Sequence, residues 1–174
     1  GRVPVNTANL RGIEALPVSV EISLSGGIPG LTIVGMPDVA GLEARSRIRC
    51  AIASCGFEIP RLHVTVNLAP ADMKKSGTAF DLPIAAAILC ATGQVPHERL
   101  DGTLLFGELA LDGSVRPVRG SIAYALLARE LGLLPCSADD SCIAGESLPS
   151  WGLSSLRDLL GSRRPMSLER ARKV

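Results

Sequence analysis

Residues 74 to 83, KKSGTAFDLP, place two lysines and a serine directly before a glycine and a strongly apolar segment. Such residues can cradle a phosphate, form a nucleophile turn, or simply begin a helix. A Walker-type phosphate loop has the order G-x-x-x-x-G-K-[ST], in which glycine-rich backbone surrounds the phosphates. Here Lys74, Lys75 and Ser76 precede Gly77, and no earlier glycine closes the loop. The sequence therefore does not predict ATP hydrolysis by this stretch.

The other reactive side chains show no pattern of a catalytic or metal site. The two histidines, His63 and His97, have no recognisable partner motif that would activate a serine. The five cysteines form no C-x-x-C pair, and with two histidines they lack the spacing of a zinc site. We interpret the cysteines as reduced, cytosolic thiols, and the histidines as an exposed strand residue and a loop residue.

Charge and composition limit the partners. Lysine and arginine number 18 against 17 acidic residues, so the net charge of +1 requires any contact with nucleic acid to be local. Only 3% of residues are aromatic, which leaves few platforms for stacking on bases. The longest apolar run, residues 82–91, is too short to span a bilayer, and the N-terminus has no signal pattern. The sequence predicts a soluble cytoplasmic protein with no membrane partner.

The elements that would position KKSGTAFDLP follow from hydrophobic periodicity. Residues 18–24 alternate between apolar and polar side chains, and the turn residues after them lead into a second apolar run, LTIV at 31–34, so a hairpin is predicted. A helix is predicted over about residues 39–55, since Asp38 can cap it and Gly56 can end it.

Residues on either side of KKSGTAFDLP predict a strand and a buried helix. Residues 62–68 alternate, with Leu62, Val64, Val66 and Leu68 expected to face inward. Residues 82–92 are rich in alanine and leucine and apolar on all sides, which predicts a buried central helix.

In the remaining part of the chain, the sequence predicts a hairpin and a helix, followed by a short strand, a loop and a last helix. Asp112 and Gly113, between strand-like flanks in residues 103–118, are typical of a hairpin turn. A helix over SIAYALLAREL should end at Gly132. Residues 133–161 predict a short strand, a loop and a last helix. The overall expectation is one mixed-sheet α/β (α+β) domain over residues 1–162, with a linker beginning over residues 163–174.

Four segments together carry a family resemblance: SVEISLSGGIPGLTIVGMPD (19–38), EARSRIRCAI (43–52), VTVNLAPADMKKSGTAFDLPIAAAIL (64–89) and GELALDGSVRPVRG (107–120). They closely resemble the N-terminal region of the YifB/ComM family, bacterial AAA+ ATPases related to the ATPase subunit of magnesium chelatase. The resemblance implies a fold similar to the Lon proteolytic domain, which is also shared with a ribosomal protein domain. It also implies a following AAA+ module that binds ATP and Mg²⁺, and a homo-oligomeric, hexameric ring that drives branch migration or unwinding of DNA in natural transformation.

The resemblance also implies that this chain lacks the catalytic residues of the Lon-like proteases. Lon-like proteases place a serine at the start of the buried helix and a lysine at the start of the later helix. On that pattern Ala79 occupies the serine position and Ile122 the lysine position, so both reactive groups are absent. We therefore expect no catalytic residue, no cofactor and no metal ligand in this chain, and an accessory role in subunit contacts, DNA guidance or both. KKSGTAFDLP is then structural: Gly77 allows the turn, Asp81 accepts N–H bonds from the first helical turn, and Pro83 is tolerated there.

Three functional alternatives remain open. Lys74 and Lys75 could hold a phosphate of DNA, extended by Arg45, Arg47 and Arg49, although a solvated helix face partly neutralised by Glu43 explains these arginines as well. A peptidase could use a displaced pair drawn from Ser76 or Ser121 and from Lys74 or Lys75. The chain could also be an autonomous DNA-binding module.

Overall fold

The computed structural model describes residues 4–75, 77–139, 149–163 and 165. The strands are β1 (Val5–Arg11), β2 (Glu14–Ser25), β3 (Gly30–Val34), β4 (His63–Ala69), β5 (Thr103–Leu105), β6 (Glu108–Leu109), β7 (Val115–Arg116), β8 (Leu134–Ala138) and β9 (Trp151–Leu153). The helices are α1 (Asp38–Ser54), α2 (Asp81–Ala91) and α3 (Ser121–Leu131), with short 3-10 helices η1 (His97–Arg99) and η2 (Leu156–Leu160). The predicted linker over residues 163–174 lies almost entirely outside the described residues.

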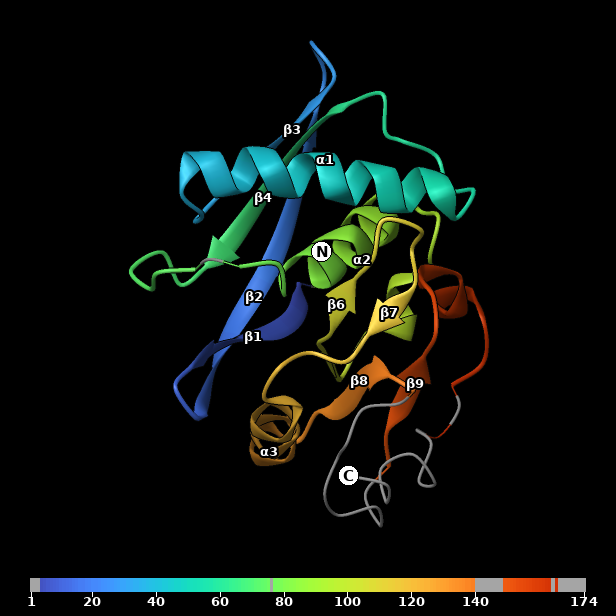
Figure 1. Ribbon diagram of the computed structural model, residues 1–174. Coiled ribbons are helices and arrows are strands. Elements are labelled where there is room, and N and C mark those ends of the chain that lie inside the picture. The colour runs from blue at the N-terminus through green and yellow to red at the C-terminus, as the bar shows by residue number, and fades with distance from the viewer. Residues whose placement is uncertain (1–3, 76, 140–148, 164, 166–174) are drawn as a thin grey trace.

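A mixed sheet with helices on both faces forms the domain, as predicted for the α/β class (Figure 1). Within the described residues it has seven strands in the order β3-β4-β2-β1-β5-β8-β9, in which β1–β2 and β2–β4 are antiparallel and the other pairs parallel. Val18, Val20 and Ile22 of β2 pack with α1 and α2, whereas Ala15 packs with α3. Because alternate positions of a strand face opposite sides, α3 covers the other face of the sheet.

The predicted hairpin between residues 18–24 and 31–34 is wrong. Both segments are strands, but β4 lies between them and pairs antiparallel with β2 and parallel with β3. A parallel pair needs a long connection, and α1 provides it by burying Ala44, Ile48, Ala51 and Ile52. As predicted, β4 buries Val64, Val66 and Leu68, but Leu62 precedes the strand and is exposed.

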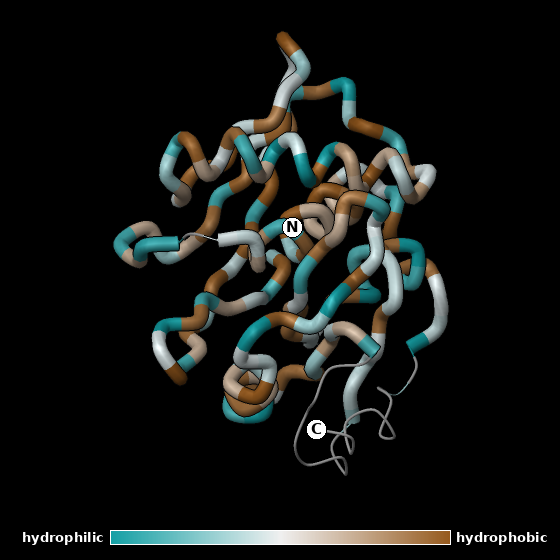
Figure 2. The backbone as a smooth tube through the Cα atoms, in the orientation of Figure 1, coloured by the Kyte–Doolittle hydropathy of each residue, from teal (hydrophilic) through white to brown (hydrophobic). Residues whose placement is uncertain are grey.

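Helix α2 is the buried centre of the fold, as predicted. It contacts α1 on one side and strands β1 and β2 on the other (Figure 1). Every residue from Asp81 to Leu89 is buried, which explains why its sequence has no polar face. Figure 2 shows hydrophobic residues (brown) alternating with hydrophilic ones (teal) along the strands. No helix in the described part of the chain is long and apolar enough to cross a membrane.

The predicted turn at Asp112 and Gly113 joins β6 and β7, which form a separate two-stranded sheet. The Asp112 carboxylate accepts hydrogen bonds from the backbone N–H (2.9 Å) and hydroxyl (2.7 Å) of Ser114, which lower the pKa of Asp112. Gly113 has a φ of +87° and sits against Cys55, so a Cβ at this position would lie 2.0 Å from the Cys55 Sγ. The turn thus fastens the hairpin to the end of α1.

Helix α3 ends at Gly132, as predicted, where a φ of +70° closes the helix. Its Tyr124 ring stacks on Phe106, with centroids 5.0 Å apart. Beyond it, the sequence analysis predicted one strand and a helix, whereas the structure has two parallel strands, β8 and β9, and the 3-10 helix η2. The first strand, β1, was also missed, since polar Asn6, Thr7 and Asn9 interrupt its apolar pattern.

Candidate functional site at the start of helix α2

The loop between β4 and α2 carries the KKSGTAFDLP stretch, and internal hydrogen bonds hold it in place. The Asn9 side chain of β1 donates to the Lys74 carbonyl over 2.9 Å. The Lys75 Nζ donates to the carbonyl of Met73 over 2.7 Å and also to the carbonyl of Pro70. The loop is therefore folded around the Lys75 ammonium group.

The two lysines lie in different environments. Lys74 is exposed, as expected of a phosphate contact, but the Lys75 side chain is completely buried. The expectation that Lys75 offers its charge to a ligand is wrong for this fold, because the ammonium donors are directed at loop carbonyls. A buried charge is tolerated when it is hydrogen-bonded in this way. Ser76, a candidate nucleophile of the displaced pair, lies outside the described residues.

We expect Lys75→Met to lower the free energy of unfolding by about 2–3 kcal/mol, because it keeps the volume but leaves two carbonyls without their donor. Lys74→Met, one residue away and exposed, is the matched control and should stay within about 0.5 kcal/mol of wild type. Urea unfolding of both variants measures the difference. Equal stability of the two variants would show that the Lys75 bonds contribute nothing.

Gly77, Thr78 and Ala79 lead into the helix. Gly77 has a φ of +91°, which fits its expected role in a turn. The Thr78 hydroxyl donates to the Glu108 carboxylate of β6 over 2.6 Å. Ala79 is half-buried against the apolar cluster that contains Phe106 and Tyr124. The helix start is thus joined to the β6–β7 sheet as well as to the loop.

An ion pair that the sequence analysis missed joins α1 to the start of α2, with its carboxylate buried and its guanidinium partly exposed. Arg47 of α1 donates to both carboxylate oxygens of Asp81, with Nε to Oδ2 at 2.6 Å and Nη2 to Oδ1 at 3.1 Å. Asp81 was expected to accept N–H bonds from the first turn of α2; it is the first residue of the helix, after the N-cap residue Phe80, and its side chain is 1% exposed and bonded to Arg47. Burial raises the pKa of Asp81 while Arg47 opposes that rise, and the Asp81 partner raises the pKa of Arg47. The only sequence signal was an aspartate at the start of a helix with no polar face.

The two positions that resemble the Lon dyad lie at the starts of two helices and carry no reactive group. Ala79 lies two residues before the first residue of α2. Ile122 lies in the first turn of α3, and half of its surface is exposed. Ala79 and Ala123, the neighbour of Ile122, pack against the same apolar cluster. The Tyr124 phenol beside them stays protonated at neutral pH, since burial raises its pKa to about 12. Among these side chains there is neither a nucleophile nor a base.

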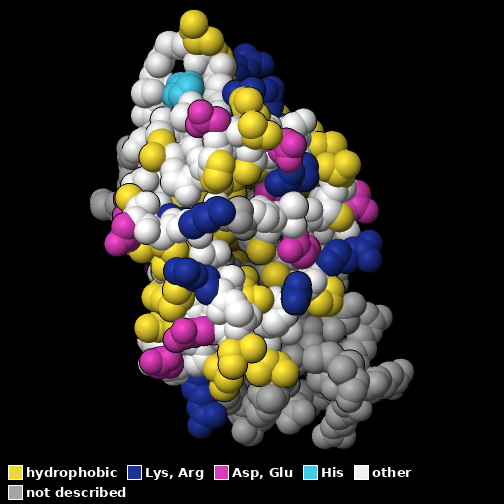
Figure 3. All heavy atoms as spheres, turned by 60° about the vertical axis from the view of Figure 1, so that its left-hand side comes forward, with side chains coloured by type: hydrophobic (Ala, Val, Ile, Leu, Met, Phe, Trp, Pro, Cys, Tyr) yellow, Lys and Arg dark blue, Asp and Glu magenta, His cyan; other side chains and the backbone are white. Residues whose placement is uncertain are grey.

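The candidate arginines of α1 differ in their surroundings. Arg45 is half-exposed and donates from Nη1 to the Leu31 carbonyl over 3.4 Å, whereas Arg49 is exposed. Figure 3 brings forward the side on which the loop after β4 projects, and there Lys and Arg side chains (dark blue) are interspersed with acidic ones (magenta). Lys74 and Arg49 are exposed and Arg45 is partly exposed, and with a net charge of +1 any contact that they make with nucleic acid would be local. Within the described residues, no group of histidine, cysteine and acidic side chains could hold a metal ion.

Comparison with known proteins places this site in a family. The sequence model of the family described as "Subunit ChlI of Mg-chelatase" matches residues 20–136, which include the whole loop, α1, α2 and α3. The chain belongs to the ChlI family. Residues 20–136 of this ChlI-family chain hold both the Arg47–Asp81 pair and the buried Lys75.

Curated relatives agree with this assignment. The ChlI-family chain is 47% identical over 128 residues to "Uncharacterized protein YifB" of Escherichia coli K12, covering 74% of the chain and 25% of the relative. It is 44% identical over 123 residues to "Uncharacterized protein Rv2897c" of Mycobacterium tuberculosis H37Rv, covering 71% and 24%. It is 40% identical over 139 residues to "Competence protein ComM" of Haemophilus influenzae, covering 78% and 27%. The resemblance to the YifB/ComM family is confirmed, and the chain spans about a quarter of the length of these relatives.

Proposed function

We propose that this chain is a non-catalytic accessory domain of a magnesium-chelatase-related ATPase of the YifB/ComM type. The observation that carries the proposal is that the charged side chains around the start of α2 bind to other groups of the same domain. Lys75 and Asp81, which could otherwise act on a substrate, are buried in bonds to loop carbonyls and to Arg47. Alanine and isoleucine occupy the two positions that resemble the Lon dyad. These features support a role in positioning rather than in chemistry.

The parent protein is proposed to be an ATP-driven ring motor on DNA, a bacterial cytoplasmic hexamer that acts in natural transformation. The relative named as a competence protein supports this direction. ATP and Mg²⁺ would bind to an AAA+ module of the parent, and the partners of this domain would be that module, the neighbouring subunits and DNA. The length of the relatives, about four times the matched segment, leaves room for such a module in them.

Contact of the domain with DNA would be electrostatic, because the exposed candidates are cations and aromatic residues make up only 3% of the chain. In a full-length protein that carries this domain, we expect Lys74→Ala, Arg45→Ala and Arg49→Ala each to weaken DNA binding. Each phosphate contact removed should lower the slope of log affinity against log salt by about 0.9. DNA titrations at several salt concentrations measure this slope, and ATP turnover without DNA should be unchanged.

Arg129→Ala is the matched control for charge, since Arg129 is exposed on α3, which covers the other face of the sheet. It should leave the salt slope unchanged. If the Lys74, Arg45 and Arg49 variants also keep the wild-type slope, DNA guidance by these residues is refuted, and the accessory role shifts to subunit assembly.

A further inference from the structure

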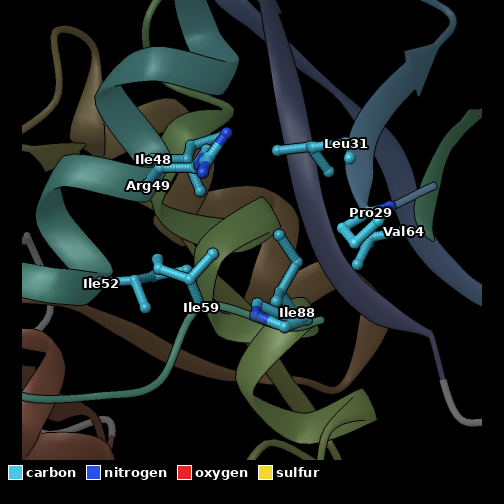
Figure 4. A pocket seen from close by; sticks show the side chains of 10 residues that line it. Pro29, Leu31, Ile48, Arg49, Ile52, Ile59, Val64 and Ile88 are labelled. Carbon is cyan, nitrogen blue, oxygen red and sulfur yellow. The ribbon is translucent and has the colours of Figure 1, made fainter. Parts of the chain in front are cut away.

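An apolar pocket lies between α1 and the beginnings of β3 and β4 (Figure 4). Ile48 and Ile52 of α1, Ile88 of α2 and Leu31 and Val64 of the strands contribute aliphatic side chains to it. Its other lining residues are Pro29, Gly30, Arg49, Ile59 and Pro60. The cavity volume of about 70 Å³ is roughly half that of an engineered cavity of about 150 Å³ that holds benzene. The pocket therefore suits one aliphatic side chain rather than an aromatic ring.

A single charge lies in the lining. Arg49 is the charged residue of the pocket, and no acidic side chain lines it. Arg47 and Arg45 of the same helix donate to Asp81 and to the Leu31 carbonyl, whereas Arg49 makes no hydrogen bond or ion pair within the described residues. A guanidinium group binds a carboxylate through two parallel hydrogen bonds. A ligand that matches the pocket thus joins an aliphatic group to a carboxylate.

The neighbouring strand supplies a place for a longer ligand. β3 is an outer strand of the sheet, and its first residues, Gly30 and Leu31, line the pocket. The Leu31 carbonyl accepts a long bond of 3.4 Å from the Arg45 side chain, and the edge of an outer strand can pair with an added strand. An extended segment lying antiparallel to β3 would end, at its C-terminus, beside the pocket. A free carboxylate there would reach Arg49.

We propose that this pocket binds the C-terminal residue of a peptide chain. The aliphatic side chain fills the pocket, the terminal carboxylate pairs with Arg49, and the preceding residues lie along the outer edge of β3. This binding site goes beyond the accessory role proposed above. Arg49 is also a candidate DNA contact in that role, but peptide binding needs neither DNA nor ATP, so the two roles of Arg49 are measured separately.

The test uses the 174-residue chain and a fluorescent six-residue peptide that ends in leucine with a free carboxylate. Saturable binding by fluorescence anisotropy is expected. The same peptide with a C-terminal amide should bind at least about tenfold more weakly, because a charged hydrogen-bonded pair is lost. Arg49→Gln should weaken the free-acid peptide by about tenfold and leave the amide unchanged. N-acetyl-leucine, which lacks the preceding residues, should bind at least about tenfold more weakly than the peptide.

Arg61→Gln is the matched control, because Arg61 is exposed in the neighbouring hollow that shares Ile59 and Pro60 with the pocket. It should change the affinity by less than about twofold. The thermal midpoint of Arg49→Gln is measured alongside, so that a folding defect is recognised. Equal binding of acid and amide, equal losses in both arginine variants, or no saturation at about 1 mM peptide would overturn the proposal. If N-acetyl-leucine binds as tightly as the peptide, the residues before the C-terminus contribute nothing. The pocket would then be a site for small carboxylic acids, and the proposal that it binds a peptide would be overturned.

Discussion

Replacing Arg47 by alanine is expected to lower the free energy of unfolding by about 3–5 kcal/mol at neutral pH. The substitution leaves the Asp81 carboxylate, which is 1% exposed, without the partner that binds both of its oxygens. Arg45→Ala is the matched control on the same helix. Its side chain is half-exposed and makes one bond of 3.4 Å, so its loss should stay below about 1 kcal/mol. Urea unfolding at constant pH measures both values.

The effect of Arg47→Ala should depend on pH in a defined direction. Burial raises the pKa of Asp81 in the folded state, and Arg47 opposes that rise. A carboxyl whose pKa is higher in the folded than in the unfolded state favours folding when protonated, and that contribution is lost as pH rises through the folded pKa. Without Arg47 the pKa of Asp81 rises further. The stability deficit of the variant should therefore be largest at neutral pH and shrink on acidification.

A double variant separates the ion pair from packing. Arg47→Ala combined with Asp81→Asn removes the uncompensated charge, so it should be more stable at neutral pH than Arg47→Ala alone. If the double variant is less stable than the single one, or if the deficit does not change with pH, the loss comes from packing of the arginine side chain and not from the buried charge.

Gly113→Ala is the second substitution with a large expected effect. Its Cβ would lie 2.0 Å from the Cys55 Sγ, and the φ of +87° is strained for any residue with a side chain. Strained backbone of about 1–2 kcal/mol and overpacking of about 1–3 kcal/mol together predict a loss of about 2–5 kcal/mol. Thermal or urea unfolding measures this loss.

Gly12→Ala tests the same backbone strain without a clash. Gly12 has a φ of +64°, and nothing lies within 4 Å of the Cβ that it would gain. Its loss should be limited to about 1–2 kcal/mol. Similar losses at Gly12 and Gly113 would mean that the end of α1 moves aside and that Cys55 does not hold the β6–β7 turn.

Local sequence patterns predicted which segments form strands and helices, but they did not predict which strands lie next to each other in the sheet. The alternation in β2 and β4 gave the correct buried faces, and the apolar run before Thr92 gave the buried helix α2. The placement of β3 beside β4 was not predictable in this way, because a period of two fixes which face is buried but not which strand lies alongside. Strand β1 was missed for a different reason, because Thr7 and Asn9 are polar and yet buried and so interrupt the apolar alternation.

The polar contacts of the site were the least predictable part. Arg47 and Asp81 are 34 positions apart, and only the packing of α1 on α2 brings them together. Lys74 and Lys75 are identical in type and adjacent, yet one is exposed and the other buried. A lysine can be buried when nearby carbonyls accept hydrogen bonds from its ammonium group, as those of Pro70 and Met73 do for Lys75, and that depends on the path of the loop, which hydrophobic periodicity does not record.

The insertion of β4 between β2 and β3 constrains the order in which the chain can fold. β2 and β3 are separated by only four residues, 26–29, so they can meet long before β4, which follows α1 in the sequence. A hairpin formed by these neighbours would occupy the edge of β2 that β4 needs. Such an intermediate would have to open before the native sheet could form, which makes it a kinetic trap. The glycines and the proline of that short segment therefore lie where native and competing folding routes diverge.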